Sequence, residues 1–82
     1  MLNIMTPYEK YDKIFIEVLN ADVNDLSSIS RTNHHAWDSL AHMSLIQAIE
    51  ESFNCRFVFE DIVSFTSHQA GIDILKKKNA YK

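Results

Sequence analysis

The chain has 82 residues, a length that predicts one domain, and its single cysteine excludes an internal disulfide framework or a zinc site built from cysteines. Hydrophobic residues make up 46% of the sequence, with one glycine and one proline, which is typical of a compact helical protein and not of a disordered or turn-rich β protein. The net charge is −3, and all 11 acidic residues precede a basic end that begins at Lys76. Because an acidic body repels nucleic-acid phosphates, we expect protein partners with basic patches and no nucleic acid.

The basic end holds four lysines, Lys76, Lys77, Lys78 and Lys82. Such a run could bind RNA or an anionic membrane, but we favour the plainer interpretation that the lysines complement the dipole of a helix end and stay in solvent. No apolar run approaches the roughly 20 residues that span a bilayer. Residues 1–5 lack the basic start and apolar core of a signal peptide. We therefore expect a cytoplasmic protein that does not bind membranes.

The first predicted helix begins at Thr6, which forms a capping box with Glu9 and is followed by a proline at the first helical position. Apolar residues then recur at spacings of three and four, and the helix should end near Asn20. Residues 21–36 are rich in Asp, Asn, Ser and Thr, so they should form a long loop, and loops of this length are often functional. Three spaced apolar side chains should attach this loop to the core: Val23, Leu26 and Ile29.

The second predicted helix begins at Asp38 and Ser39 and runs to Phe53 without glycine or proline. Either polar residue can cap it, because a side-chain oxygen there accepts a backbone N–H that would otherwise lack a partner. A serine hydroxyl at this end lies at the positive pole of the helix dipole, where a phosphate is stabilised. Projection at about 100° per residue separates two faces. The core face holds His42, Leu45, Ile46, Ile49 and Phe53, and the outer face holds Leu40, Gln47 and Glu51, with Met43 at the border.

The rest of the chain predicts a connector and two further helices. Asn54 should end the second helix in a left-handed conformation, and residues 55–59, which alternate like a strand but have no partner strand, should be an extended connector. Residues 60–65 should form a short helix that begins with an acidic turn. A second capping box, Thr66 with Gln69, predicts a last helix through about Lys78, in which Gly71 costs about 1 kcal/mol relative to alanine.

These elements, together with the motif Asp38-Ser39-Leu40, resemble the acyl carrier protein family, in which a serine that opens the second helix after a long loop carries a phosphopantetheine arm. The resemblance covers about residues 6–77. It implies an all-α fold, a small four-helix bundle of three longer helices and one short helix, with a long loop between the first two. It also implies a monomeric carrier with no catalytic activity of its own. Trp37 before the aspartate resembles free-standing carriers of specialised pathways.

By this resemblance Ser39 is the attachment residue, Asp38 is a flanking motif residue, and 4′-phosphopantetheine is the covalent cofactor. A phosphopantetheinyl transferase would supply the metal and the base for attachment. The thiol of the arm would then carry an acyl or aminoacyl group as a thioester between loading and transferring enzymes. These partners should dock beside the serine and on acidic side chains that extend to Glu60 and Asp61. The docking residues on the second helix are Leu40, Met43, Gln47, Glu50 and Glu51.

The resemblance leaves the cargo and the pathway open. Ala41, His42 and Ser44 occupy positions that are often acidic in the carriers of fatty-acid synthesis. These departures argue against the housekeeping carrier of fatty-acid synthesis, but they do not identify the pathway. Fatty-acid, polyketide, nonribosomal-peptide and surface-glycan pathways remain as alternatives.

Other interpretations have less support in the sequence. An enzyme that uses Ser39 as its nucleophile needs a base within reach, and His42 should face the core. Adjacent His34 and His35 point in different directions in an extended chain and complete no ligand set, so we expect no metal site. Cys55 should be a buried small apolar residue. The main alternative is a small helical protein–protein interaction module that keeps the carrier-like scaffold without the arm.

Overall fold

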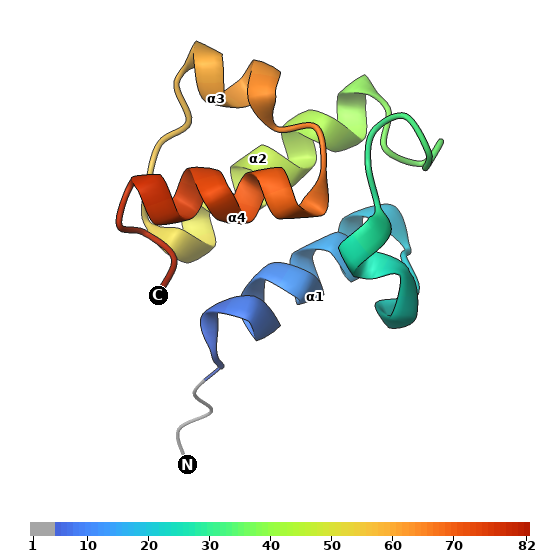
Figure 1. The fold of residues 1–82 in the computed structure, drawn as a ribbon, viewed down its shortest axis with the longest axis horizontal. Helices are drawn as coiled ribbons and strands as arrows, with labels where there is room; N and C mark the ends of the chain where they lie inside the picture. Colours follow the sequence, from blue (N-terminus) through green and yellow to red (C-terminus); the bar gives the residue numbers. More distant parts are fainter. Residues whose placement is uncertain (1–4) are drawn as a thin grey trace.

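A computed structural model describes residues 5–82, and this part of the chain is helical (Figure 1). Its elements are α1 (Pro7–Leu19), the 3-10 helix η1 (Val23–Ser28), α2 (Ser39–Phe53), α3 (Phe59–Ser64) and α4 (His68–Lys77). Within the described residues the only β pairing is an isolated bridge between Ser30 and Ser67, so the predicted all-α class is confirmed there. In Figure 1 α4 crosses the middle of the view, with α3 above it and α1 below it.

None of the helices in residues 5–82 is long and apolar enough to cross a membrane. The expectation that the start of the chain is not a signal peptide concerns mainly residues 1–4, which lie outside the described residues.

The capping box at the start of α1 is present as predicted, and the helix ends at Leu19, next to the expected Asn20. The Thr6 hydroxyl accepts the N–H of Glu9 at 3.3 Å, and the Glu9 carboxylate accepts the N–H of Thr6 at 2.9 Å. Asn20 ends the helix in the left-handed region, with φ of 54°. Asparagine tolerates this conformation better than most residues, so it replaces the usual glycine here.

The long connection between α1 and α2 is partly helical, which the sequence did not predict. Asp22 accepts the N–H of Asn24 and starts η1, which packs against α1 and α4. Leu26 and Ile29 are buried, as expected for the residues that attach this segment to the core. The same prediction is wrong for Val23, which is the first residue of η1 and is 63% exposed.

The predicted start of the last helix is wrong by one residue. Ser67 is the N-cap of α4, and its hydroxyl accepts the N–H of Ala70 at 3.0 Å. The carbonyl of Thr66 instead accepts the N–H of Arg31 at 3.0 Å, which keeps Thr66 in extended pairing with the loop before α2. Gln69 therefore makes no capping box, and its side chain donates to Asp73.

Gly71 lies where α4 meets α1, and its missing side chain permits a close approach. The hydroxyl of the fully buried Tyr11 donates to the carbonyl of His68 at 2.7 Å, beside the Gly71 Cα. A Cβ atom on Gly71 would overlap this hydroxyl and would lie 2.7 Å from Cε1 of Phe65. Glycine at position 71 lowers the helix propensity of α4, but the packing of the core requires it.

Candidate functional site

Ser39 is the first residue of α2, and it is exposed. Asp38 is the N-cap: its carboxylate accepts the N–H of Ala41 at 2.9 Å, and its carbonyl accepts the N–H of His42 at 2.8 Å. Of the two residues that could cap the helix, Asp38 therefore does so. The first N–H groups of an α-helix have no acceptor within the helix and give this end a partial positive charge. A phosphate attached to Ser39 would be stabilised by that charge.

The two faces of α2 are as the sequence predicts. The core face is buried along its length at His42, Leu45, Ile46, Ile49 and Phe53. On the outer face Leu40 is 79% exposed and Met43 is 51% exposed, and Gln47 and Glu51 are exposed as well. Two apolar side chains therefore lie in solvent within one turn of Ser39.

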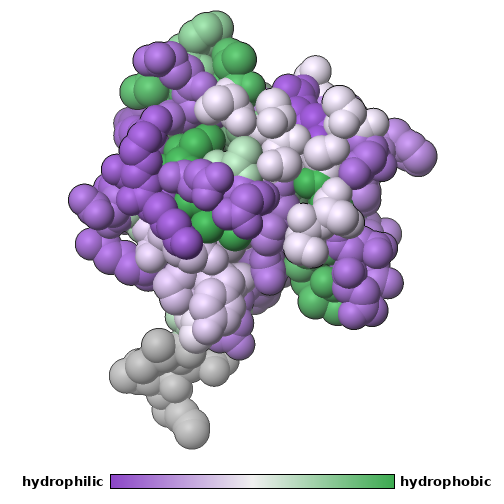
Figure 2. Space-filling model, viewed as in Figure 1, coloured by the Kyte–Doolittle hydropathy of each residue, from purple (hydrophilic) through white to green (hydrophobic). Residues whose placement is uncertain are grey.

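Helix α3 also exposes apolar side chains. Phe59 is 77% exposed, and its neighbours Val58 and Val63 are more than half exposed. Figure 2 shows hydrophobic side chains gathered over α3, at the top of that view. Helices α2 and α3 are joined through His42, so the two sets of exposed apolar residues belong to adjoining elements.

His42 has two buried partners and cannot serve Ser39 as a base. Its Nδ1 accepts from the indole Nε1–H of Trp37 at 3.0 Å, and its Nε2 lies 2.9 Å from the carbonyl of Ile62. Because an indole can only donate, Nδ1 must be unprotonated and Nε2 must donate to the carbonyl. Burial lowers the pKa of His42, against a raising effect of the hydrogen bond to Ile62, and Arg31 lowers it further. The ring is therefore neutral at neutral pH and both nitrogens are occupied.

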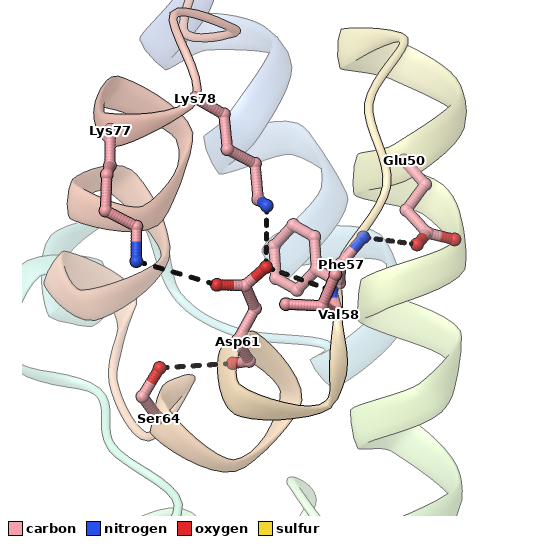
Figure 3. Close-up of polar contacts among 7 residues, drawn as sticks. All are labelled: Glu50, Phe57, Val58, Asp61, Ser64, Lys77 and Lys78. Atoms are coloured by element: carbon pink, nitrogen blue, oxygen red, sulfur yellow. Dashed lines mark hydrogen bonds and ion pairs between the residues drawn. The ribbon is translucent and has the colours of Figure 1, made fainter.

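The acidic residues near the end of α2 have different surroundings. Glu51 is exposed, whereas the Glu50 carboxylate accepts the backbone N–H of Phe57 at 2.8 Å (Figure 3). Glu60 is exposed, but Asp61 is only 2% exposed. The expectation that Asp61 contributes to an acidic docking surface is therefore wrong, because its carboxylate is occupied inside the protein.

Lysines from the end of α4 surround the Asp61 carboxylate. Nζ of Lys78 lies 2.6 Å from one carboxylate oxygen, and Nζ of Lys77 lies 3.8 Å from the other. Burial acts to raise the pKa of Asp61, but the hydrogen bonds from Lys78 and from the Val58 N–H outweigh it and hold the pKa below its ordinary value. The expectation that the lysines stay in solvent is therefore wrong for Lys78, whose side chain is 21% exposed.

The remaining candidate residues are not brought together. In the part of the chain that the structure describes, no group of three or more His, Cys, Asp or Glu side chains could hold a metal ion. His34 lies in a turn, where its carbonyl accepts the N–H of Trp37, and His42 is occupied as described. Cys55 is half-buried rather than buried, and burial raises the pKa of its thiol, which makes it a weak nucleophile at neutral pH.

Two polar contacts of this region were missed by sequence reasoning. A tryptophan and a histidine that face a core both need hydrogen-bond partners. The sequence therefore indicated that Trp37 and His42 make buried hydrogen bonds, but it did not indicate with which groups. The Asp61–Lys78 contact carried no such signal, because an acidic residue in a first helical turn and a lysine in a last turn are both satisfied by helix dipoles alone.

No family model matches the chain, and no curated protein is similar enough to count as a match.

Proposed function

We propose that this protein is a free-standing acyl carrier protein that bears 4′-phosphopantetheine on Ser39. The observation that carries the proposal is the geometry of the start of α2: an exposed serine at the first helical position, directly after an aspartate that takes over the capping role. The hydroxyl is thus accessible to an enzyme and lies at the positive end of a 15-residue helix.

The residues around Ser39 are compatible with such a group. In the attachment step the hydroxyl oxygen forms a bond to the phosphorus next to pantetheine in coenzyme A, the pyrophosphate bond breaks and the nucleotide leaves. Among the described residues, His42 cannot serve as the base for this step because both of its nitrogens are occupied, so in this proposal a transferase supplies the base and the metal. The attached group supplies a thiol that holds an acyl or aminoacyl cargo as a thioester.

The transferase and the cargo enzymes would contact the surface beside the serine. Leu40 and Met43 offer apolar area within one turn of the attachment point, and Phe59 is a further exposed apolar side chain on α3. Gln47 and Glu51 extend the surface along α2, and Glu51 would attract basic partner residues. Glu50 contributes less to such attraction, since its carboxylate already accepts the N–H of Phe57.

The proposal includes a four-helix bundle of the carrier type, with α1, α2 and α4 as the longer helices and α3 as the short one. It also includes a cytoplasmic, monomeric protein with no enzymatic activity of its own. The packing of α1 against α2, and of η1 against both α1 and α4, supports this arrangement.

The second candidate is a helical protein–protein interaction module without an arm. The exposed apolar residues of α2 and α3 favour it as much as they favour the carrier, because exposed apolar surface of this kind often binds another protein. The two candidates differ at Ser39 alone.

Intact-mass spectrometry distinguishes the two candidates. Purified protein is incubated with coenzyme A, Mg²⁺ and a broad-specificity phosphopantetheinyl transferase, and the carrier proposal expects the mass of one phosphopantetheine group to be added. Ser39→Ala should gain nothing and should remain folded, because Asp38 still caps α2. An unmodified wild-type protein under conditions that fully modify a known carrier would favour the interaction module.

A further inference from the structure

Helix α3 has an unusual attachment to the rest of the protein. It has six residues, too few to be stable alone, and its only buried residue is Asp61. Phe59 and Val63 are exposed, and Ile62 is half-buried against the core. The position of α3 therefore depends on polar contacts more than on buried apolar side chains.

The first of these contacts joins α3 to the end of α4. The Asp61 carboxylate accepts the N–H of Val58 at 3.0 Å, and Lys78 lies 2.6 Å from the same oxygen (Figure 3). The Asp61 carbonyl accepts the N–H of Phe65 at 2.9 Å and the Ser64 hydroxyl at 3.3 Å. One residue thus links both ends of the helix, and its charge is balanced chiefly by Lys78.

The second contact joins α3 to α2. Nε2 of His42 donates to the carbonyl of Ile62, one of the last four carbonyls of α3, for which a helix itself provides no N–H donor. His42 lies one turn from Ser39, so this contact places α3 beside the candidate attachment site.

Anchored residues flank α3 on both sides. Phe57 is buried and its N–H is bonded to Glu50, and Phe65 is fully buried among aromatic rings. A movement of α3 can therefore be confined to the residues between these two phenylalanines.

We propose that residues 58–64 open as a local unit under the control of the Asp61–Lys78 ion pair, while α1, α2 and α4 stay folded. Loss of the lysine charge leaves a buried carboxylate whose remaining partners are one N–H and the distant, mostly exposed Lys77. An uncompensated buried charge is strongly unfavourable, so the open state gains population. If the proposed carrier function holds, this opening rearranges the surface that partner enzymes meet beside Ser39; the opening itself does not depend on that function.

Amide hydrogen exchange followed by NMR tests the proposal without the arm. The reporters are the N–H groups of Val58, Ile62 and Phe65, and the references are those of Leu45 and Ile49 in the middle of α2. Lys78→Met should speed exchange of the reporters at least about tenfold and leave the references within about threefold of wild type. The matched control is Lys77→Met, which removes a lysine that is 72% exposed and 3.8 Å from the carboxylate. Lys77→Met should change the exchange rates of the reporter N–H groups by less than about threefold.

Several results would overturn the proposal. An unchanged exchange rate of the reporter N–H groups in Lys78→Met would overturn it. Equal acceleration of exchange at the reporter and reference N–H groups would also overturn it, because it would indicate global unfolding. In an Asp61→Asn background, Lys78→Met should lose most of its effect on the reporters, because the charge it balances is gone. A full effect in that background would show that Lys78 acts through another contact.

A measurement on the wild-type protein keeps the proposal testable if Lys78→Met does not fold. Local opening exposes less surface than global unfolding, so exchange of the three reporters should depend less on urea than exchange of Leu45 and Ile49. Equal dependence on urea would mean that α3 opens only with the whole domain.

Discussion

Replacing Gly71 with alanine tests the packing of α4 against α1. By helix propensity alone the substitution should stabilise the protein by about 1 kcal/mol, because glycine is the weaker helix former. The structure predicts the opposite sign. The new Cβ would overlap the hydroxyl of Tyr11 and would approach Cε1 of Phe65 to 2.7 Å, and both side chains are fully buried.

The expected magnitude follows from two costs and one gain. Overpacking a core costs about 1–3 kcal/mol, and losing the hydrogen bond from Tyr11 to the His68 carbonyl leaves buried polar atoms unpaired at about 1–3 kcal/mol. After the gain in helix propensity of about 1 kcal/mol, we expect a net loss of about 1–5 kcal/mol. For a domain of this size that corresponds to a fall in Tm of roughly 4–40 °C.

Urea and thermal unfolding monitored by circular dichroism measure this loss. The control is a double-mutant cycle with Tyr11→Phe, which removes the hydroxyl that the new Cβ meets. In the wild-type protein Tyr11→Phe should lower the free energy of unfolding, because the hydrogen bond to the His68 carbonyl is lost. In the Gly71→Ala background it should lower the free energy of unfolding little or should raise it, because it removes the hydroxyl that the new Cβ overlaps. A Gly71→Ala protein as stable as wild type would refute the close approach of α4 to α1.

The remaining predictions concern α2. Leu40→Ala should change the free energy of unfolding by less than about 0.5 kcal/mol, yet it should slow the transfer of the arm to Ser39. Ile49→Ala should lower the free energy of unfolding by about 2–5 kcal/mol. Similar losses of stability in the two variants would contradict the assignment of Leu40 to the outer face of α2 and of Ile49 to its core face. Glu51→Lys should slow arm transfer at low salt, and added salt should narrow the difference; equal rates at low salt would exclude Glu51 from docking. Burial lowers the pKa of His42 in the folded protein, so the unfolded state, in which this pKa is near 6.5, binds a proton more tightly. The free energy of unfolding should therefore fall as the pH drops from 6.5 toward the lowered pKa of the folded state. In His42→Gln this part of the pH dependence of urea unfolding should disappear, and its persistence would assign it to other groups.

Features determined by neighbouring residues could be predicted from the sequence. The capping box of Thr6 and Glu9 and the left-handed Asn54, both predicted and both present, depend on contacts within a few positions. The two faces of α2 follow from the period of the helix, which explains why the exposure of Leu40 and the burial of Ile49 were predicted correctly.

Features determined by distant parts of the chain could not be predicted. Thr66 and Ser67 can both cap a helix, and the nearby Gln69 favours Thr66, but the pairing of the distant Arg31 with Thr66 decides for Ser67. Asp61 and Lys78 each suit the helix end on which they lie, so nothing local indicated that the fold would bury one against the other. In the candidate site the position of Ser39 was predictable, whereas the contacts that hold α3 beside it were not.

The most direct test of the account is to locate the modification within the protein. Trypsin should release residues 32–56 as one peptide, which contains Ser39, Ser44, Ser52 and Cys55. After treatment with coenzyme A and a transferase, fragmentation of this peptide should place a single phosphopantetheine group on Ser39. Ser44→Ala, which changes an exposed serine further along α2, should be modified like wild type, and Ser39→Ala should not be modified. Modification at another residue, or persistence of the added mass in Ser39→Ala, would contradict the account.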